Sequence, residues 1–358
     1  MDERTQGYLS TVWIVNKVRL ENREMETDID IVVAWVDGSD PEWLELKGQY
    51  SNSNNDNVDE RVSRYRNLDI FRYWFRGIEA FAPWVHRIHF VTWGHVPKWL
   101  NVKHEKLNIV RHTDFIPREY LPTFSANPIE LNFHRIPELS EKFIYFNDDM
   151  FLIKKTLKQD FFVNGKPCDA GILAPHCYDE DEMWVLTPFV NIGVINKHFD
   201  MKTVIKKNKS LWFNSKYGKF NLTNLVLFNC PRFPGIKQDH LPTSFLKKTF
   251  TEVWSFEEKS LDATCQHKFR EKLDINQWLF KEWQIVGGNF YPRSPKIGNS
   301  FGFISEPIED ICSYIEKQKG KMICINDNDI PEERFQVYSK MLVDSFDKIL
   351  GRKSSFEW

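Results

Sequence analysis

Four stretches near the start of the chain are almost continuously apolar and β-branched or aromatic. Such runs, in place of an alternation of apolar and polar residues, are typical of strands buried on both faces of a parallel sheet. Each run ends in polar or turn-forming residues, as a strand does where it reaches the surface. The predicted strands cover residues 29–38 (IDIVVAWVDG), 86–94 (HRIHFVTWG), 107–114 (LNIVRHTD) and 143–149 (FIYFNDD).

Helical spacing appears between these runs. In residues 64–84, apolar side chains recur on one helical face, and this pattern stops near Pro83. Residues 127–142 are predicted to begin a second helix, in which Ile129 and Phe133 are four positions apart. The order β-α-β-β-α-β predicts a doubly wound, mostly parallel α/β sheet, whose ligands gather beyond the carboxyl ends of the strands. The apolar face of the first helix carries Leu68, Phe71, Phe75 and Ile78.

The second half of the chain has a less regular pattern. Residues 155–262 are rich in turn-forming segments and are interpreted as an insertion or lid. Residues 264–283 are predicted to form a helix with Arg270, Asp274, Gln277 and Lys281 on one face. This polar face can belong to a functional site, or it can be a solvated helix face with an ion pair inside the helix. A C-terminal amphipathic helix is predicted over 331–350, with a core-facing side made of Phe335, Val337, Tyr338, Met341, Leu342 and Phe346.

We therefore expect one catalytic domain over residues 29–358. Its parts are an α/β core (29–154), an insertion or lid (155–262) and a helical, C-terminal part that completes the site (263–358). Residues 1–28 form an N-terminal extension with a helical pattern, which suits packing against the body or docking to a membrane or partner. The apolar positions of that pattern are Leu9, Val12, Trp13 and Leu20.

Charge and cysteine content narrow the class of protein. The 48 basic and 50 acidic residues give a net charge of −2 without a long block of either sign, so the chain lacks the footprint of a nucleic-acid-binding protein. Six scattered cysteines without a CxxC pair favour reduced thiols in a cytoplasmic protein. The first residues lack a signal-peptide pattern, and no apolar run is long enough to span a bilayer.

Adjacent carboxylates stand where the fourth predicted strand ends. Asp148 and Asp149 can hold a divalent cation that bridges diphosphate oxygens, because hard cations choose oxygen ligands. A solvated loop or a helix N-cap explains the pair equally well. After the first strand, Asp37, Gly38 and Ser39 in WVDGSDP suit either a turn whose backbone N–H groups hold a phosphate or an ordinary tight turn.

His240 lies in a proline-flanked loop (QDHLP). There it can act as an acid, a base or a hydrogen-bond donor to a phosphate, or it can be an ordinary surface residue. The chain contains no GxxxxGK[ST], GxSxG or HExxH motif and no zinc-ligand spacing, which excludes several enzyme classes. Residue chemistry by itself therefore predicts an α/β enzyme that handles a phosphorylated ligand with a metal.

Several long blocks of the chain resemble the Stealth family of phosphotransferases. They occur in the family's order and span roughly residues 29–357, so the resemblance covers nearly the whole chain. The compact length looks like the bacterial members that make capsules and exopolysaccharides, and the animal lysosomal-enzyme N-acetylglucosamine-1-phosphotransferase is similar in the same blocks. The blocks are IDIVVAWVDGSDP, RYRNLDIFRYWFRGIEAFAPWVHRIHFVTWGHVPKWLN, HRIPELSEKFIYFNDDMF, DHLPTSF with KFREKLDINQW, and CINDND with KSSFE.

The resemblance implies roles for residues in these blocks. Asp148 and Asp149 would hold Mg²⁺ or Mn²⁺ or assist the acceptor, His240 would be the leading acid/base group, and Arg270 would stabilise charge on the transferring phosphate. The residues expected on the donor side are Asp37, Gly38, Ser39, Arg76, Asn147, Asp274, Gln277 and Asn326.

The activity implied is transfer of a hexose 1-phosphate, such as N-acetylhexosamine 1-phosphate from UDP-GlcNAc, to a glycan hydroxyl, with release of a nucleoside monophosphate. Expected partners are the nucleotide sugar and a polysaccharide or lipid-linked oligosaccharide acceptor, without nucleic acid. The expected location is the cytoplasm, with peripheral association at the inner face of the plasma membrane or with capsule-assembly machinery. Two alternatives stay open: a metal-dependent glycosyltransferase that releases the diphosphate, and a non-catalytic carbohydrate-binding component of capsule assembly.

Overall fold

The computed structural model describes residues 28–51, 58–59, 65–66, 68–177, 186–327 and 330–358. The predicted N-terminal extension, apart from Asp28, lies outside these ranges. Within them, five strands form a central sheet in the order β4-β3-β1-β5-β9. Four of them are parallel and β9 is antiparallel to β5. The strands are β1 (Ile29–Ala34), β3 (Ile88–Thr92), β4 (Leu107–Arg111), β5 (Lys142–Asn147) and β9 (Thr243–Leu246).

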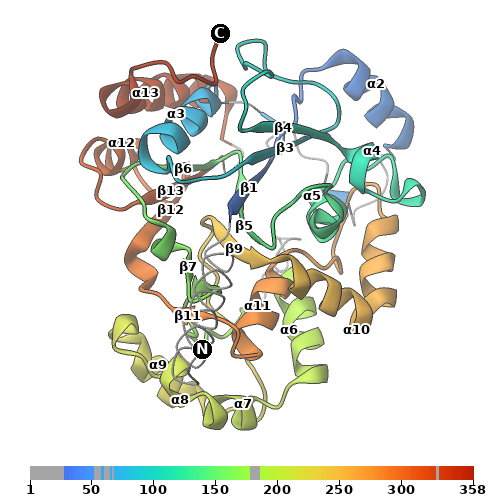
Figure 1. Ribbon diagram of the computed structural model, residues 1–358, viewed down its shortest axis with the longest axis vertical. Helices are drawn as coiled ribbons and strands as arrows, with labels where there is room; N and C mark the ends of the chain where they lie inside the picture. The colour runs from blue at the N-terminus through green and yellow to red at the C-terminus, as the bar shows by residue number, and fades with distance from the viewer. Residues whose placement is uncertain (1–27, 52–57, 60–64, 67, 178–185, 328–329) are drawn as a thin grey trace, which may run out of the picture.

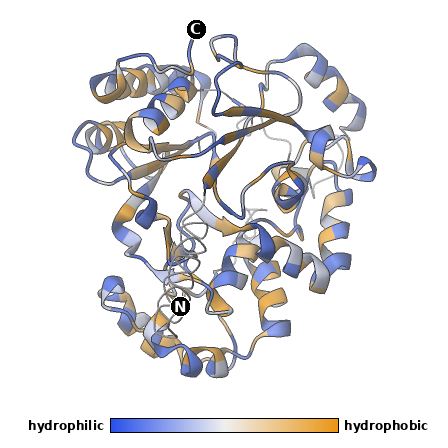
Figure 2. Ribbon diagram, in the orientation of Figure 1, coloured by the Kyte–Doolittle hydropathy of each residue, from blue (hydrophilic) through white to orange (hydrophobic). Residues whose placement is uncertain are grey.

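The parallel strand order confirms the predicted fold class. From β1 the chain crosses to β3 and β4 on one side and then returns to β5 on the other side, which is the doubly wound arrangement. The uniformly apolar strands are explained by cores on both faces: Ile31 and Val33 of β1 pack into one cluster and Val32 into the other. Figure 2 shows these strands as predominantly hydrophobic between helices of mixed polarity.

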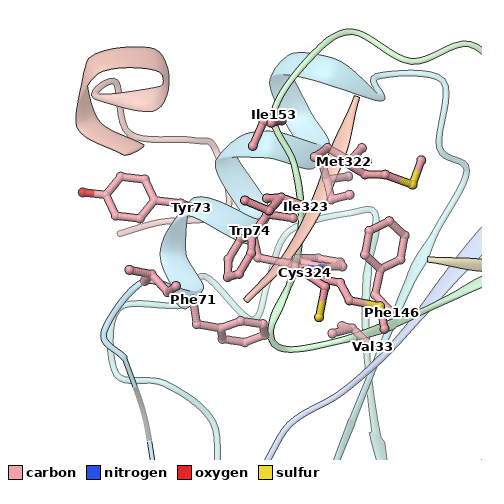
Figure 3. Close-up of a cluster of buried hydrophobic side chains, with 14 of the residues drawn as sticks. Val33, Phe71, Tyr73, Trp74, Phe146, Ile153, Met322, Ile323 and Cys324 are labelled. Atoms are coloured by element: carbon pink, nitrogen blue, oxygen red, sulfur yellow. The ribbon is translucent and has the colours of Figure 1, made fainter. Parts of the chain in front are cut away.

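Helix α3 (Phe71–Phe81) covers one face of the sheet together with a smaller sheet. That sheet has the order β12-β13-β6 and is backed by α12 (Ile308–Glu316) and α13 (Glu332–Leu350). Figure 3 shows Phe71 and Trp74 of α3 facing Cys324 and Phe146, and the rings of Trp74 and Phe146 are 5.5 Å apart. The strands are β6 (Met150–Leu152), β12 (Gly298–Gly302) and β13 (Met322–Asn326).

The opposite face of the sheet is covered by helices from several parts of the chain (Figure 1). Residues 243–246 and the helix after them, which fall in the region interpreted as an insertion, supply the edge strand and part of this cover. A small sheet with the order β11-β8-β7 and three short helices lie at the end of the molecule opposite the C-terminus. The covering helices are α5 (Ala126–Leu131), α6 (Leu186–His198), α10 (Lys247–Gln266) and α11 (Trp278–Val286).

The remaining elements complete the description. Within the described ranges, no helix combines the length and the apolar character that crossing a bilayer requires. None of the six cysteines forms a disulfide. The other helices are α2 (Pro41–Tyr50), α4 (His112–Phe115), α7 (Met201–Lys207), α8 (Lys209–Trp212) and α9 (Phe220–Leu227), and the other strands are β2 (Val58–Asp59), β7 (Phe162–Val163), β8 (Lys166–Asp169), β10 (Arg270–Glu271) and β11 (Tyr291–Pro292).

The predicted helix over residues 264–283 is wrong. α10 ends at Gln266, Arg270 and Glu271 pair with β2 as a short antiparallel strand, and α11 begins only at Trp278. The Asp274 side chain accepts the Glu271 N–H, and the Asn276 side chain accepts the Trp278 N–H. Asp and Asn compete in this way for backbone donors, which interrupts a helix despite its favourable spacing.

Other predicted boundaries also shift. The first helix begins at Phe71, so Leu68 precedes it, and α5 ends at Leu131 before a 3-10 turn that contains Phe133. The C-terminal helix forms where predicted, but Val337 is 57% exposed and was wrongly placed on the core-facing side. Its position two residues after the buried Phe335 rotates it about 200° around the helix, away from the core.

Candidate active site

The carboxyl ends of β1 and β5 meet where the winding of the sheet reverses. Ala34, the last residue of β1, lies beside Asn147, the last residue of β5. Asp37 follows the end of β1, and Asp148 and Asp149 follow the end of β5. The segments that carry them therefore leave the sheet at the same edge. In doubly wound folds ligands bind at this position, because the diverging connections leave a crevice there.

The turn after β5 joins the two sheets. Asp148 and Asp149 connect β5 directly to β6, which pairs with β13 of the smaller sheet. The Asp149 carbonyl accepts a hydrogen bond of 3.0 Å from the Ile325 N–H. This pairing brings Asn326, the end of β13, beside the two carboxylates, although Asn326 is 177 positions further along the chain.

His240 completes the cluster from the loop that precedes β9. Its Nδ1 atom lies 3.1 Å from Asn326 Oδ1, and its Nε2 atom lies 3.1 Å from Asn147 Nδ2. A carbonyl oxygen accepts and an amide nitrogen donates, so this pattern assigns the proton to Nδ1 and leaves a lone pair on Nε2. The sequence-predicted residues Asn147, Asp148, Asp149, His240 and Asn326 are therefore brought together.

The pKa values of two acidic groups in this cluster are raised. Burial, and then the charge of Asp149, raise the pKa of Asp148 to about 7. Burial, and then the charge of Asp149, also raise the pKa of the Cys324 thiol well above its usual value. Cys324 Sγ lies 3.5 Å from His240 Nδ1. The raised pKa disfavours the thiolate, which is the form in which a cysteine acts as a nucleophile.

The cluster fits a divalent cation. Among the described residues, Asp149, His240 and Cys324 offer ligand atoms within 4.8 Å of one another. A metal ligand must be deprotonated, which the raised pKa of Cys324 opposes. The carboxylates of Asp148 and Asp149 are the donors that Mg²⁺ or Mn²⁺ prefers, and a cation bound to them would offset both causes of the raised pKa of Asp148, its burial and the charge of Asp149.

Asp37, Gly38 and Ser39 form a tight turn at the same edge of the sheet. The Asp37 carboxylate accepts from both the N–H and the hydroxyl of Ser39, at 3.0 and 2.6 Å. The Asp37 N–H donates to His95 Nε2, 2.8 Å away, and burial lowers the pKa of His95, which keeps this nitrogen an acceptor. A Cβ atom on residue 38 would lie 2.3 Å from the Tyr65 carbonyl oxygen, so only glycine fits.

Arg270 belongs to a second cluster, next to the first. Its charge acts on Glu130, which accepts a 2.8 Å hydrogen bond from the Tyr145 hydroxyl. Burial raises the pKa of Glu130 to about 7, and the hydrogen bond from Tyr145, the charge of Arg270 and the backbone N–H of Gln277 limit that rise. Tyr145 lies two residues before Asn147 on β5 and feels the charges of Asp148 and Asp149. Gln277 is buried, and its Oε1 atom has no hydrogen-bond partner in the described ranges.

Asp274 and Arg76, both expected on the donor side, bind other groups of the protein in this structure. The fully buried Asp274 carboxylate accepts from His267 Nδ1 (2.7 Å), Asn127 Nδ2 (3.1 Å) and the Glu271 N–H (2.8 Å). It holds the segment between α10 and α11 in place. Lys281, expected on the same face, is buried 3.6 Å from Asp169.

The buried guanidinium of Arg76 binds the C-terminal segment. Its Nε and Nη2 atoms donate to the two carboxylate oxygens of Glu357, at 2.7 and 2.8 Å. Its Nη1 atom donates to the Leu350 carbonyl at 3.0 Å. These bonds occupy the fork of donors that a diphosphate would need, so Arg76 has a structural role.

Sequence reasoning did not single out Cys324, Glu130 or Glu282. Glu282 is fully buried on α11 and accepts a 2.8 Å hydrogen bond from Gln238, two residues before His240. Its sequence context, WLFKEWQIV, gives one signal: a carboxylate inside an apolar helix needs a partner. Cys324 begins the CINDND block, from which sequence reasoning took only Asn326, and Glu130 lies in an unremarkable segment; the tertiary contacts reveal both.

The two clusters can be compared with known proteins. Residues 27–55 match Stealth protein CR1, conserved region 1, and residues 64–169 match Stealth protein CR2, conserved region 2. Capsular polysaccharide phosphotransferase WcwK of Streptococcus pneumoniae is 40% identical over 332 residues, which are 92% of this chain and 98% of that protein. The chain belongs to the Stealth family. It is therefore a phosphotransferase, and the matched regions contain both the Asp37 turn and the Asp148–Asp149 turn.

Other phosphotransferases align with the chain over a similar length. Receptor polysaccharide phosphotransferase WefC of Streptococcus gordonii is 40% identical over 93% of this chain and 100% of its own. Exopolysaccharide phosphotransferase cps2G of Lactiplantibacillus plantarum is 37% identical over 92% and 96%. Among solved structures, the WbbM bifunctional glycosyltransferase matches with a TM-score of 0.37 and 11% identity, over 90% of this chain and 50% of that one. The galactosyltransferase LgtC matches with a TM-score of 0.34 and 10% identity, over 87% and 95%.

Proposed function

We propose that this Stealth phosphotransferase transfers a sugar 1-phosphate from a nucleoside-diphosphate sugar to a hydroxyl of a growing capsular or exopolysaccharide glycan. The product is a phosphodiester, and the leaving group is a nucleoside monophosphate. The observation that carries the proposal is the convergence of two carboxylates and a histidine, whose Nε2 lone pair faces the Asn147 amide, at the ligand-binding edge of the sheet.

The atoms of the reaction can be assigned to the cluster. The acceptor oxygen forms a bond to the phosphorus that carries the sugar, and the bond from that phosphorus to the bridging oxygen breaks. The hydroxyl proton moves to Nε2 of His240, whose Nδ1–H is held by Asn326. A bound Mg²⁺ or Mn²⁺, held by Asp148 and Asp149, would neutralise charge on the diphosphate. Arg270 supplies a further positive charge beside the strand end.

We assign His240 to the acceptor side of the reaction, as the group that takes the hydroxyl proton. Nε2 contacts the Asn147 amide, which must turn or shift for a hydroxyl to approach, and both groups belong to the crevice edge. The Asp37 turn, with Gly38 packed on Tyr65, is the remaining donor-side element of the proposal. Nucleotide sugars are made in the cytoplasm, and we place the reaction there.

A labelled donor tests the proposal. The protein is incubated with Mg²⁺, a glycan acceptor and nucleotide sugars that carry ³²P in the phosphate next to the sugar, with UDP-GlcNAc first in the panel. Label in the glycan and release of unlabelled nucleoside monophosphate are expected. Label that stays in a released diphosphate would show a glycosyltransferase instead, and binding without release of any nucleotide would show a carbohydrate-binding protein. The His240→Ala variant is the matched control for contaminating hydrolysis.

A further inference from the structure

Helix α9 presents three large aliphatic side chains to solvent, although its Phe220 and Leu227 pack partly against the protein. Leu222, Leu225 and Val226 are 66%, 58% and 60% exposed and share one face at positions i, i+3 and i+4. The inward face carries Asn224, which is fully buried. A surface helix of a globular protein ordinarily turns its apolar side chains toward the core and its polar ones toward solvent. The exposed apolar face of α9 therefore indicates a binding surface.

Hydrogen bonds from Asn224 fix this orientation. Its Nδ2 atom donates to the Gly171 and Trp212 carbonyls, and its Oδ1 atom accepts the Leu173 N–H at 2.7 Å. Rotating α9 to bury the leucines would leave these buried polar groups without partners. The outward apolar stripe is therefore held in place by the fold.

The surroundings of α9 are strongly basic. Residues 201–238 contain seven Lys and one Arg without a single Asp or Glu, in a chain whose net charge is −2. Figure 1 shows α7, α8 and α9 together at the end of the molecule opposite the C-terminus. Contacts confirm this grouping: Asn224 binds the last residue of α8, and the Lys202 amine of α7 lies 5.7 Å from the Phe228 ring. The exposed basic residues are Lys206, Lys207, Lys209, Lys216, Lys219 and Arg232.

We propose that α7, α8 and α9 form a docking surface for an anionic membrane. Aliphatic side chains would enter the boundary between headgroups and acyl chains, while the lysines contact anionic headgroups. Charge complementarity selects this partner, because a second copy would bring the same basic surface against it. Composition supports it as well: protein interfaces are depleted in Lys and enriched in aromatic residues and Arg.

The docking surface is connected to the candidate active site. Leu173 and Ile236 form a β-bridge, and the Lys237 N–H donates to the Ile172 carbonyl at 2.8 Å. His240 follows three residues after Lys237. The backbone of residues 171–173, which binds Asn224 of α9, therefore also binds the segment that leads into the His240 loop. The inference stands independently of the proposed function; where both hold, the acceptor reaches His240 as a lipid-linked glycan.

Vesicle co-sedimentation of the full-length protein tests this surface. Phosphatidylcholine vesicles with and without phosphatidylglycerol are compared at low and high salt. We expect binding that requires phosphatidylglycerol and weakens with salt. Leu222→Asp combined with Leu225→Asp should lower partitioning about ten-fold or more. Each Lys→Gln change at Lys206, Lys207 or Lys209 should lower it roughly five-fold at low ionic strength.

Val337→Asp is the matched control, since Val337 is similarly exposed but lies on α13, at the other end of the molecule. It should bind vesicles like the wild type, and all variants should keep the wild-type melting temperature and turnover of a water-soluble acceptor. Equal binding by Leu222→Asp/Leu225→Asp and wild type would overturn the proposal. If vesicle binding is lost only in Leu9→Asp/Trp13→Asp, the N-terminal segment is the membrane-binding part and the proposal is wrong. If the protein self-associates without lipid and the α9 variants abolish this association, the partner of α9 is a second copy of the chain and the proposal is also wrong.

Discussion

The Nδ1 atom of His240 lies 3.1 Å from the Oδ1 atom of Asn326, and this contact determines which ring nitrogen carries the proton. Asn326 is itself held, because its Nδ2 atom donates to Ser300 Oγ at 3.0 Å. Nδ2 also lies 3.4 Å from the Phe301 carbonyl oxygen, which can only accept, so turning the amide over would leave this oxygen without a donor. Nε2 of His240 therefore keeps the lone pair that a general base needs.

Changing this contact should move the pH profile. Asn326→Asp places a carboxylate beside Nδ1 and stabilises the imidazolium, so the acid side of the kcat/KM profile should move upward by about one pH unit. Asn326→Ala removes the acceptor and should lower kcat without that displacement. The two profiles are measured on folded protein with saturating Mg²⁺. If Asn326→Asp leaves the profile in place, His240 is not the base.

The carboxylate pair should be essential for turnover. Asp148→Asn or Asp149→Asn should reduce kcat roughly a hundred-fold or more, because a dication would lose a charged ligand. Chelation with EDTA should abolish activity, and Mg²⁺ or Mn²⁺ should restore it. Wild-type rates in both variants would retire the metal site, and activity that survives exhaustive chelation would leave Asp149 as a base without a metal.

Arg270 and His240 should act as a unit. Arg270→Lys keeps the charge but loses the planar fork of donors, and a large fall in kcat with a modest change in KM is expected. His240→Ala should also lower kcat, and the double variant should be little worse than the poorer single variant. Steady-state kinetics of all three separate this from additive effects. Near-normal kcat in both single variants would remove both residues from the site.

Glu282 should make stability depend on pH. Burial raises its pKa from 4.5 to about 8, so between these values the folded chain holds a proton that the unfolded chain has lost. Stability therefore decreases as the pH rises through this window, by about 1.4 kcal/mol per unit from this group. Glu282→Gln keeps the acceptor for Gln238 and should remove that slope. Urea unfolding at several pH values measures it, and identical slopes in variant and wild type would contradict the assignment.

The Arg76–Glu357 pair should be structural. Glu357→Ala leaves a buried guanidinium without its carboxylate and should lower the free energy of unfolding by about 3–5 kcal/mol. Replacing both residues, with Arg76→Met and Glu357→Leu, should recover part of that loss. The folded double variant should keep its KM for the donor. A raised donor KM at normal stability would instead return Arg76 to the donor side.

Local sequence determined the elements whose chemistry repeats along the chain. The apolar runs of β1, β3, β4 and β5 predicted parallel strands because both faces are buried, and their order predicted a doubly wound sheet. The position of Asp148 and Asp149 at a strand end followed directly, since strand ends are legible in sequence.

Tertiary structure decided what distant segments do together. The helical spacing of Arg270, Asp274 and Gln277 was misleading, because Asp274 and Asn276 bind backbone donors and Arg270 pairs with β2. The spacing of residues indicates only a local periodicity, and it cannot predict that a segment pairs with a strand more than 200 residues earlier in the chain. The contacts of His240 with Asn147 and Asn326 are equally long-range. Leu222, Leu225 and Val226 of α9 face solvent because Asn224, on the inner side of the helix, makes hydrogen bonds to three backbone groups inside the protein. The pattern of residues 220–227 does not predict these hydrogen bonds, because their partners lie in other segments.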